Sequence, residues 1–341
     1  MKKMIFIVLL LSVCIISCNS KKSDGSSVER DSVLTVYSYD SFASWGLGSR
    51  AVPEFERLYN CKVVMVTAGD AGSILNRLIL EKDDPVADIA IGIDNTFLSK
   101  ALKHDVFQAY KPKNIVSVDQ SVIFDNSFHL TPYDYGYFAF VYDSKKIKNP
   151  PKSFEQLLSD DNKEKIILID PRTSSPGKGL FLWAMAVYGE DGFEDFWRRI
   201  KEKTLTITSS WDDAYNAFLA GEANMVLSYA TSPAFHYGED KTTRYKAFIP
   251  SEGGYRQIEG AGVIKNCKNP ELAKLFIEFI LTEDFQKHVP ETQWMYPVLE
   301  SVSLPEGFKF CPIPLKDLSN NNVDTYFEEK WLNKWLNIMS K

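Results

Sequence analysis

Cysteine and histidine are scarce in this chain. Its 341 residues include five cysteines and four histidines, and these are too scattered to form a Cys-x-x-Cys pair or a mixed Cys/His cluster. The sequence also shows no glycine-rich phosphate loop, no G-x-S-x-G motif and no histidine-based triad. We therefore predict no catalytic residue and no metal site.

Basic residues are outnumbered by acidic ones. The 39 Lys and Arg against 45 Asp and Glu give a net charge of −6, so we expect no nucleic-acid partner. This balance suits a cationic or neutral small ligand better. With 45% hydrophobic and 25% charged residues, the chain has the composition of an ordinary globular protein, and its length indicates two lobes or domains.

A long uncharged run occupies the N-terminus. Two lysines precede residues 4–17, which carry no charge and form an export-signal pattern. The run ends in Ile15-Ile16-Ser17-Cys18, which resembles the lipobox of bacterial lipoproteins, where the cysteine is lipidated; the alternative is a plain signal peptide with incidental cysteines. We expect a signal peptide over 1–17, lipidation of Cys18, a flexible tether over 18–31, and a periplasmic or cell-surface location anchored to the membrane.

Three cysteines would remain as thiols after export, because Cys14 leaves with the signal peptide and Cys18 is lipidated. They are Cys61, Cys267 and Cys311. Three thiols allow at most one disulfide, and none has a partner at a characteristic spacing. We expect buried or unreactive thiols.

The body alternates strands and helices. Strands are predicted at 33–37, 62–66 and 87–93, with helices between and after them, which indicates a parallel wound sheet. Ligands bind such sheets beyond the carboxyl ends of the strands. Those ends carry Tyr39-Asp40, Asp70 and Asp94-Asn95.

A second unit repeats this architecture after an apolar strand at 138–142, which we expect to cross between lobes. Its strands are predicted at 165–170, 204–208 and 225–229, with helices at 178–188 and 211–220. Strands at 245–249 and 259–264 lead back to the first unit, and helices at 270–281 and 331–339 come after them. We predict an α/β fold of two lobes with a ligand cleft between them. The first lobe covers 32–140 and 251–300, the second covers 141–250, and 301–341 forms a C-terminal helical segment.

Polar clusters and aromatic residues follow several strands. Thr173 to Gly177 and Ser228 to Ser232 offer hydroxyl and N–H groups near helix starts, which suits an anion; the alternative is ordinary helix capping. Aromatic residues on neighbouring loops could sandwich a flat cationic ring, although any one of them could instead be core. The aromatic set is Tyr37, Tyr39, Phe42, Trp45, Trp211, Trp294 and Tyr296. Asp134 is placed to hydrogen bond a ligand, and Asp212-Asp213 complement a helix dipole.

Several of these segments resemble one family. The motifs are Leu34-Thr35-Val36-Tyr37-Ser38-Tyr39-Asp40-Ser41-Phe42, Leu75-Asn76-Arg77-Leu78, Asp134 to Asp143, Asp170 to Ser174, Val226 to Ala234 and Trp294-Met295-Tyr296-Pro297-Val298. In this order they resemble the periplasmic thiamine-binding proteins of bacterial ABC transporters, over about residues 33–310.

The resemblance implies a type II periplasmic-binding-protein fold that closes on thiamine, with its mono- and diphosphate as further candidate ligands. It implies delivery to an ABC permease with its ATPase, no cofactor, no enzymatic activity and a monomer. Carried over by motif, the ligand contacts are Asp70, Ala71, Ser174, Ser175, Trp211, Tyr229, Ala230, Thr231 and Ser232, with Tyr39, Trp45 and Trp294 as further candidates. Two features depart from the family pattern: Phe235 stands where the family carries Tyr, and the glycine of the Asp70-Ala71-Gly72 turn is shifted by one.

Two alternatives stay open. A ferric-iron or polyamine-binding protein would have the same fold. Iron-binding relatives carry adjacent tyrosines, whereas here Ala230 follows Tyr229. Polyamine sites need several carboxylates, which the predicted cleft loops supply only in part. A thiaminase-like enzyme needs a reactive thiolate in the cleft. None of the three remaining cysteines has a plausible base beside it in the sequence.

Overall fold

The computed structural model describes residues 33–44, 46–319 and 325–340. The predicted signal peptide, the tether, Cys18 and Trp45 lie outside these residues. The chain divides into two units, Met1–Asp31 and Ser32–Lys341, and all of the described residues belong to the second unit.

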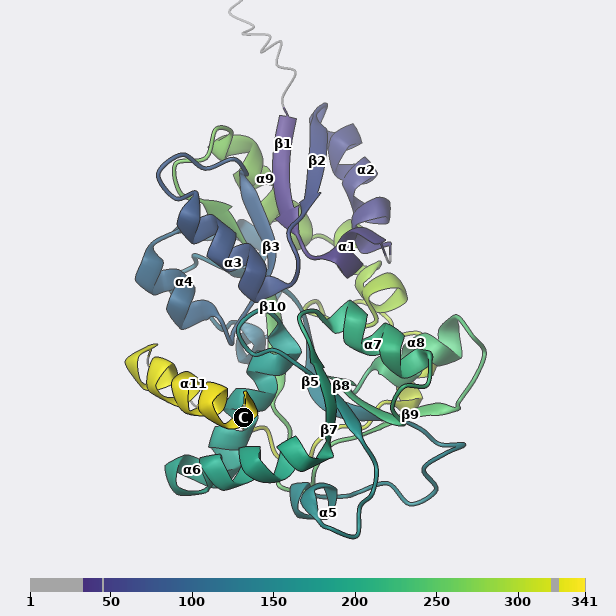
Figure 1. Cartoon of the computed structure of the whole chain (residues 1–341). Coiled ribbons are helices and arrows are strands. Elements are labelled where there is room, and N and C mark those ends of the chain that lie inside the picture. The colour runs from purple at the N-terminus through teal and green to yellow at the C-terminus, as the bar shows by residue number, and fades with distance from the viewer. Residues whose placement is uncertain (1–32, 45, 320–324, 341) are drawn as a thin grey trace, which may run out of the picture. The chain divides into compact units, whose positions relative to one another are not determined.

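A single mixed sheet runs through both lobes, with strand order β2-β1-β3-β10-β5-β8-β6-β7 (Figure 1). The strands are β1 Val33–Ser38, β2 Lys62–Thr67, β3 Ile89–Asp94, β4 Phe107–Gln108, β5 Thr131–Asp143, β6 Ile166–Ile169, β7 Thr204–Thr208, β8 Met225–Tyr229, β9 Tyr245–Phe248, β10 Arg256–Ile264 and β11 Tyr296–Pro297. The parallel pairs predicted from the strand–helix alternation are present, β1 with β2 and β3 in the first lobe and β6 with β7 and β8 in the second. The returning strand β10 is antiparallel to β3 and β5, which makes the sheet mixed rather than wholly parallel.

Strand β5 connects the lobes, as its long apolar run predicts. Residues Thr131–Tyr137 pair with β10, whereas Phe138–Asp143 pair with β8 and β9. The partner changes between Tyr137 and Phe138, inside an unbroken strand. A change of lobe therefore needs no loop here, which is why composition alone gives little sign of the boundary.

Helices cover the sheet in both lobes. The α-helices are α1 Asp40–Ser44, α2 Leu47–Tyr59, α3 Ala71–Leu80, α4 Leu98–His104, α5 Phe154–Leu158, α6 Ser175–Lys203, α7 Trp211–Leu219, α8 Ser232–Gly238, α9 Pro270–Ile280, α10 Glu283–Gln286 and α11 Thr325–Met339. Short 3-10 helices lie at Lys113–Ser117, Gln120–Val122 and Glu306–Phe310, and a π-helical turn lies at Val289–Gln293.

Helix α6 begins three residues earlier than predicted and runs 15 residues further, to Lys203. Pro176 near its start suits the first helical turn, because the N–H that proline lacks would have no helical partner there. Gly189 has φ 63° and ψ −169°, so the helix is kinked at the place where the predicted helix ends.

Each lobe has its own apolar core. The first is built around β1, β3 and α9, and the second packs Trp183 and Trp197 of α6 against the sheet. Both tryptophans are almost fully buried, so they serve packing and not ligand contact. Trp331 and Trp335 of α11 join this second core, so the C-terminal helix belongs to the second lobe.

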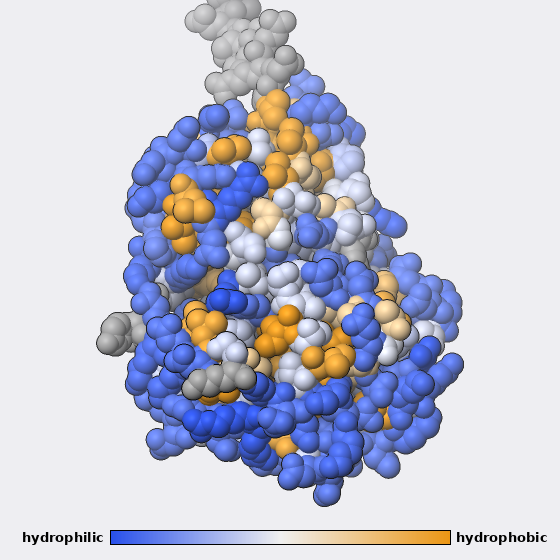
Figure 2. Space-filling model, in the orientation of Figure 1, coloured by the Kyte–Doolittle hydropathy of each residue, from blue (hydrophilic) through white to orange (hydrophobic). Residues whose placement is uncertain are grey.

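The surface is mainly hydrophilic on the face that Figure 2 shows, with apolar residues gathered over β1 and β2, where Val33 and Val64 are exposed. Within the described residues, no helix combines the length and apolarity needed to span a bilayer. Cys61 and Cys267 are buried and Cys311 is half-buried, all as free thiols.

Candidate ligand-binding cleft

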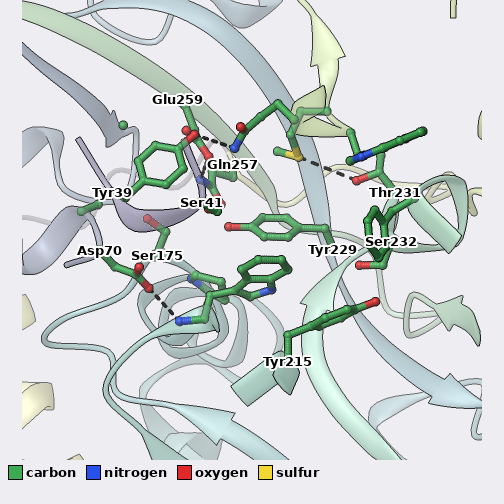
Figure 3. Close-up of a pocket in the computed structure, with 18 residues that line it drawn as sticks. Tyr39, Ser41, Asp70, Ser175, Tyr215, Tyr229, Thr231, Ser232, Gln257 and Glu259 are labelled. Carbon is green, nitrogen blue, oxygen red and sulfur yellow. Dashed lines mark hydrogen bonds between the residues drawn. The ribbon is translucent and has the colours of Figure 1, made fainter. Parts of the chain in front are cut away.

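A cavity lies between the two lobes, at the carboxyl ends of the strands. It has about 680 Å³ of non-atom space, part of which is open solvent at its mouth. Figure 3 shows its lining. The lining residues are Tyr39, Ser41, Asp70, Ala71, Gly92, Ser175, Pro176, Trp211, Tyr215, Tyr229, Thr231, Ser232, Phe235, Gln257, Glu259, Gln293, Trp294 and Met295.

One wall is a stack of aromatic rings from the second lobe. The indole of Trp211 stacks on Tyr215, with centroids 5.0 Å apart and planes at 24°. Tyr229 lies 6.1 Å from Trp211 at a tilt of 55°. Trp211 and Tyr215 are four residues apart on α7, so the helix presents both rings on one face. The wall offers flat π surfaces of the kind that attract planar cations.

Hydrogen bonds hold this wall in place. Trp211 Nε1–H donates to Ser228 Oγ at 2.9 Å, and Ser228 Oγ is 3.1 Å from Ser232 Oγ. Ser232 in turn hydrogen bonds the hydroxyl of Tyr215. Because an indole N–H can only donate, each hydroxyl accepts from one neighbour and donates to the next.

The same chain of hydrogen bonds continues to the surface. Tyr215 Oη lies 3.0 Å from His236 Nε2, and His236 Nδ1 lies 2.7 Å from Asp240 Oδ2. Burial lowers the pKa of His236, so the ring is neutral near pH 7, with Nδ1–H donating to Asp240 and Nε2 accepting from Tyr215. Five links therefore fix the orientation of Trp211.

Tyr39 and Trp294 also line the cavity. Tyr39 Oη is 2.9 Å from Tyr133 Oη and accepts a hydrogen bond from Gln293 Nε2 at 2.6 Å. Its ring covers Gly92, where a Cβ atom would lie 2.2 Å from the ring; only glycine permits this approach, and φ at Gly92 is 94°. Trp294 follows the helical turn Val289–Gln293, and its backbone is left-handed with φ 57°. The indole is therefore held at the cavity by a strained backbone conformation.

Asp70 links the two lobes. It is the first-lobe residue before α3, and its Oδ2 accepts from Ser174 Oγ and, at 2.9 Å, from Trp211 N, both in the second lobe. Gly72 N and Ser73 N donate to Thr173 O across the same boundary, at 3.0 and 3.3 Å. Burial raises the pKa of Asp70 to about 6. In this structure the lobes are thus joined directly beside the cavity.

The two hydroxyl clusters have different surroundings. Ser174 precedes α6 but does not cap it through its side chain, because that hydroxyl bonds Asp70. Ser175 lines the cavity and hydrogen bonds the buried Asp94. In the second cluster, Thr231 makes no side-chain capping bond and its hydroxyl approaches Met295 Sδ at 3.7 Å. The capping alternative therefore fails for Ser174 and Thr231.

Two acidic residues lie at the base of the cavity. Asp134 on β5 and Glu259 on β10 are register partners. Glu259 lines the cavity and accepts from the Tyr133 hydroxyl and from Gln257 Nε2, the latter at 2.8 Å. Burial raises the pKa of Glu259 to about 7, and burial together with the nearby Glu259 raises that of Asp134 well above its usual value.

Most of the residues selected from sequence meet at this cavity. Those that line it are Tyr39, Asp70, Ala71, Ser175, Trp211, Tyr229, Thr231, Ser232 and Trp294. Ser174 lies behind Asp70, and Ala230 is buried with its N–H donating to Tyr137 O at 2.8 Å. Trp45 is outside the described residues. Asp134 lies beneath the cavity rather than in its lining. Their roles toward a ligand stay predictions.

Several lining residues are not among the ligand contacts selected from the sequence. They are Ser41, Gly92, Pro176, Tyr215, Gln257, Glu259, Gln293 and Met295. The four-residue spacing from Trp211 could have identified Tyr215. Glu259 and Gln257 alternate along a returning strand, and only the pairing of β10 with β5 shows that they reach the cleft.

No cysteine contributes to the cavity lining that the structure describes. Burial raises the pKa of Cys61, of Cys267 to about 11 and of Cys311 to about 12. All three thiols are therefore protonated at neutral pH and poor nucleophiles.

Two lobes closing over a polar and aromatic cleft define a solute-binding protein, and comparison with known proteins agrees. Residues 84–320 match the bacterial extracellular solute-binding protein family. The thiamine-binding periplasmic protein of Escherichia coli is 42% identical over 313 residues, which cover 91% of this chain and 94% of that protein. The Haemophilus influenzae protein of the same name is 36% identical, covering 90% and 92%. A solved periplasmic thiamin binding protein superposes with a TM-score of 0.85 at 40% identity, covering 91% and 96%.

The chain therefore belongs to the bacterial extracellular solute-binding proteins, in the family of the thiamine-binding periplasmic proteins. This confirms the resemblance drawn from the sequence motifs and the two-lobed α/β fold. A ferric binding protein from Campylobacter jejuni and a spermidine/putrescine-binding protein from Streptococcus pneumoniae have TM-scores of 0.71 and 0.68 at 19% and 16% identity. These two share the fold alone.

Proposed function

We propose that this chain captures thiamine outside the cytoplasm and delivers it, as a monomer, to the permease of an ABC importer. Thiamine is the transported cargo in this proposal, and we assign the chain neither a cofactor nor a catalytic role. The thiamine-binding relatives support the ligand, and their extracellular family supports the partner.

The observation that carries the proposal is the chemistry of the cleft. One wall stacks Trp211 on Tyr215, the base carries Glu259, and none of the described lining residues is Lys, Arg or His. A planar cation such as the thiazolium ring suits π faces and acidic surroundings. The aminopyrimidine ring has donors and acceptors for the lining hydroxyl and amide groups. The first turn of α6, with Ser175 in the lining, is where a phosphate of the mono- or diphosphate would find donors.

Titration calorimetry tests the ligand. We expect the refolded, metal-free protein to bind thiamine, and to bind spermidine and ferric citrate at least 100-fold more weakly or without measurable heat. Including the two phosphate esters ranks them against thiamine. Tight binding of spermidine or ferric citrate without binding of thiamine would overturn the proposal in favour of the polyamine or iron alternative.

We further propose that Cys18 is lipidated and anchors the protein to the membrane. The support is the sequence Ile15-Ile16-Ser17-Cys18 after an uncharged run. We predict that Cys18→Ser abolishes incorporation of labelled fatty acid and moves the protein from the detergent phase to the aqueous phase. Cys61→Ser is the matched control and should remain in the detergent phase. Equal labelling of the Cys18→Ser variant and the unaltered protein would exclude the anchor.

A further inference from the structure

The base of the cavity holds two buried carboxyl groups, and one of them makes no hydrogen bond within the described residues. Asp134 is fully buried, and neither of its carboxyl oxygens has a hydrogen-bond partner among the described residues. Its register partner Glu259 is 5% exposed and forms part of the cavity lining. Burying an ionised carboxylate without a counter-charge is costly, so such groups bind protons or acquire a cation.

A second polar group beside this pair is also incomplete. Gln257 is 1% exposed and lines the cavity, and its Nε2 donates to Glu259 Oε1 at 2.8 Å. Its carbonyl oxygen, Oε1, accepts no hydrogen bond from the described residues. Nearly every buried acceptor in a folded protein has a donor. An unmatched acceptor in a cavity wall therefore indicates a ligand that brings an N–H group or a positive charge.

Among the residues that the structure describes, none supplies a compensating cation beside Glu259. The groups that face it are the hydroxyls of Tyr133 and Tyr39 and the carboxyls of Asp134, Asp94 and Asp70. Tyr229, on the neighbouring strand β8, also lies in the field of Glu259. The buried Lys178 forms an ion pair with Glu328 and already has its counter-charge. Without a ligand, the negative charge of Glu259 is therefore neutralised by a bound proton.

We propose that Glu259 is the counter-ion for the positively charged ring of the ligand, and that ligand capture expels the proton that Glu259 itself carries. The proposal rests on the proposed function, because it names the part of thiamine that Glu259 recognises. The balance is simple: the Glu259 carboxylic acid loses H⁺ to solvent, its carboxylate pairs with the thiazolium cation, and no bond to the ligand forms or breaks. Asp134 remains protonated behind it.

This proposal predicts proton release that depends on pH. Since the pKa of Glu259 is about 7, about half a proton per thiamine should be released at pH 7, rising toward one at pH 6. Binding should accordingly be about fivefold weaker at pH 6 than at pH 7, and constant above about pH 8. Asp70 and Asp212 have a pKa of about 6, so each is only about one-tenth protonated at pH 7 and adds little there.

The experiment counts protons by calorimetry at pH 7 in buffers of different ionisation enthalpy. It uses thiamine and a neutral isostere that carries thiophene in place of the thiazolium ring. The unaltered protein should release about half a proton with thiamine and close to none with the isostere. Glu259→Gln should lose most of the release and bind thiamine about tenfold more weakly at pH 8, while its affinity for the isostere stays within about twofold. The exposed Glu222→Gln is the matched control.

Each result bears on the proposal. Thiamine binding without proton release overturns it, as does equal release with the isostere, which would place the aminopyrimidine ring at Glu259. The measurement on the unaltered protein decides this even if Glu259→Gln does not fold. A protein that binds no thiamine at all contradicts instead the proposed function.

Discussion

Replacing Gly72 with valine should weaken thiamine binding about 100-fold, because the new side chain would hold the lobes apart. A Cβ atom at Gly72 would lie 2.6 Å from Arg172 O and 2.9 Å from Thr173 Cα, which are backbone atoms of the other lobe. Overpacking at a close contact costs about 1–3 kcal/mol, and here that cost applies only to the closed form. Gly72→Ala should give a smaller loss, about tenfold. Calorimetry measures both.

The first lobe itself should tolerate these changes. Gly72 lies in the first turn of α3, where alanine is a better helix former than glycine. The melting temperature should therefore change little, and small-angle scattering with saturating thiamine should show a larger radius of gyration than for the unaltered protein. Leu80→Ala is the matched control, since Leu80 lies on the same helix and is 87% exposed. Unchanged affinity in Gly72→Val would show that ligand binding does not require this contact.

Replacing Trp211 with alanine should weaken thiamine binding about 5- to 150-fold, which corresponds to about 1–3 kcal/mol. The substitution removes the indole face stacked on Tyr215 but keeps the backbone N–H that donates to Asp70. Binding should also change tryptophan fluorescence in the unaltered protein, and less in the variant. Calorimetry and fluorescence titration measure the two effects.

Two companion variants separate the ring from the network behind it. Trp211→Phe retains a flat face and loses the hydrogen bond to Ser228, so it should bind within about tenfold of the unaltered protein. Phe310→Ala removes a ring of the second lobe that is 39% exposed and outside the cavity lining, and it should bind normally. A folded Trp211→Ala protein with full affinity would remove Trp211 from the site.

The sequence predicts the parts of the cleft that follow local rules. Strand periodicity locates β2, β7 and β8, and their carboxyl ends identify Asp70, Trp211 and Tyr229. The hydrogen-bond partners of a side chain cannot be predicted in this way when they are distant in the chain. The Ser174 hydroxyl occupies a capping position but turns to Asp70, 104 residues away, and Glu259 meets Tyr133 at a separation of 126 residues.

The boundaries of helices and strands likewise follow partly from local sequence and partly from contacts between distant residues. Pro176 favours the start of α6, although the apolar pattern is clear only from Lys178 onward. The position in β5 where the chain passes from one lobe to the other is set by its pairing with β10 on one side and with β8 and β9 on the other. These partners are distant in the sequence, so the residues of β5 alone do not locate that position. The motif resemblance supplies much of what local patterns lack, because a family pattern retains contacts that distant residues make together.

The hydrogen bonds beside Asp70 also set how long a captured molecule stays. Thr173 O accepts from Gly72 N and Ser73 N, and Asp70 accepts from Ser174 and Trp211. All of these bonds must break together before the lobes separate, so the dissociation rate of cargo should follow the opening rate and vary little between cargoes that leave the bonds intact. A membrane partner that pulls the lobes apart would then shorten the residence time without touching the cargo.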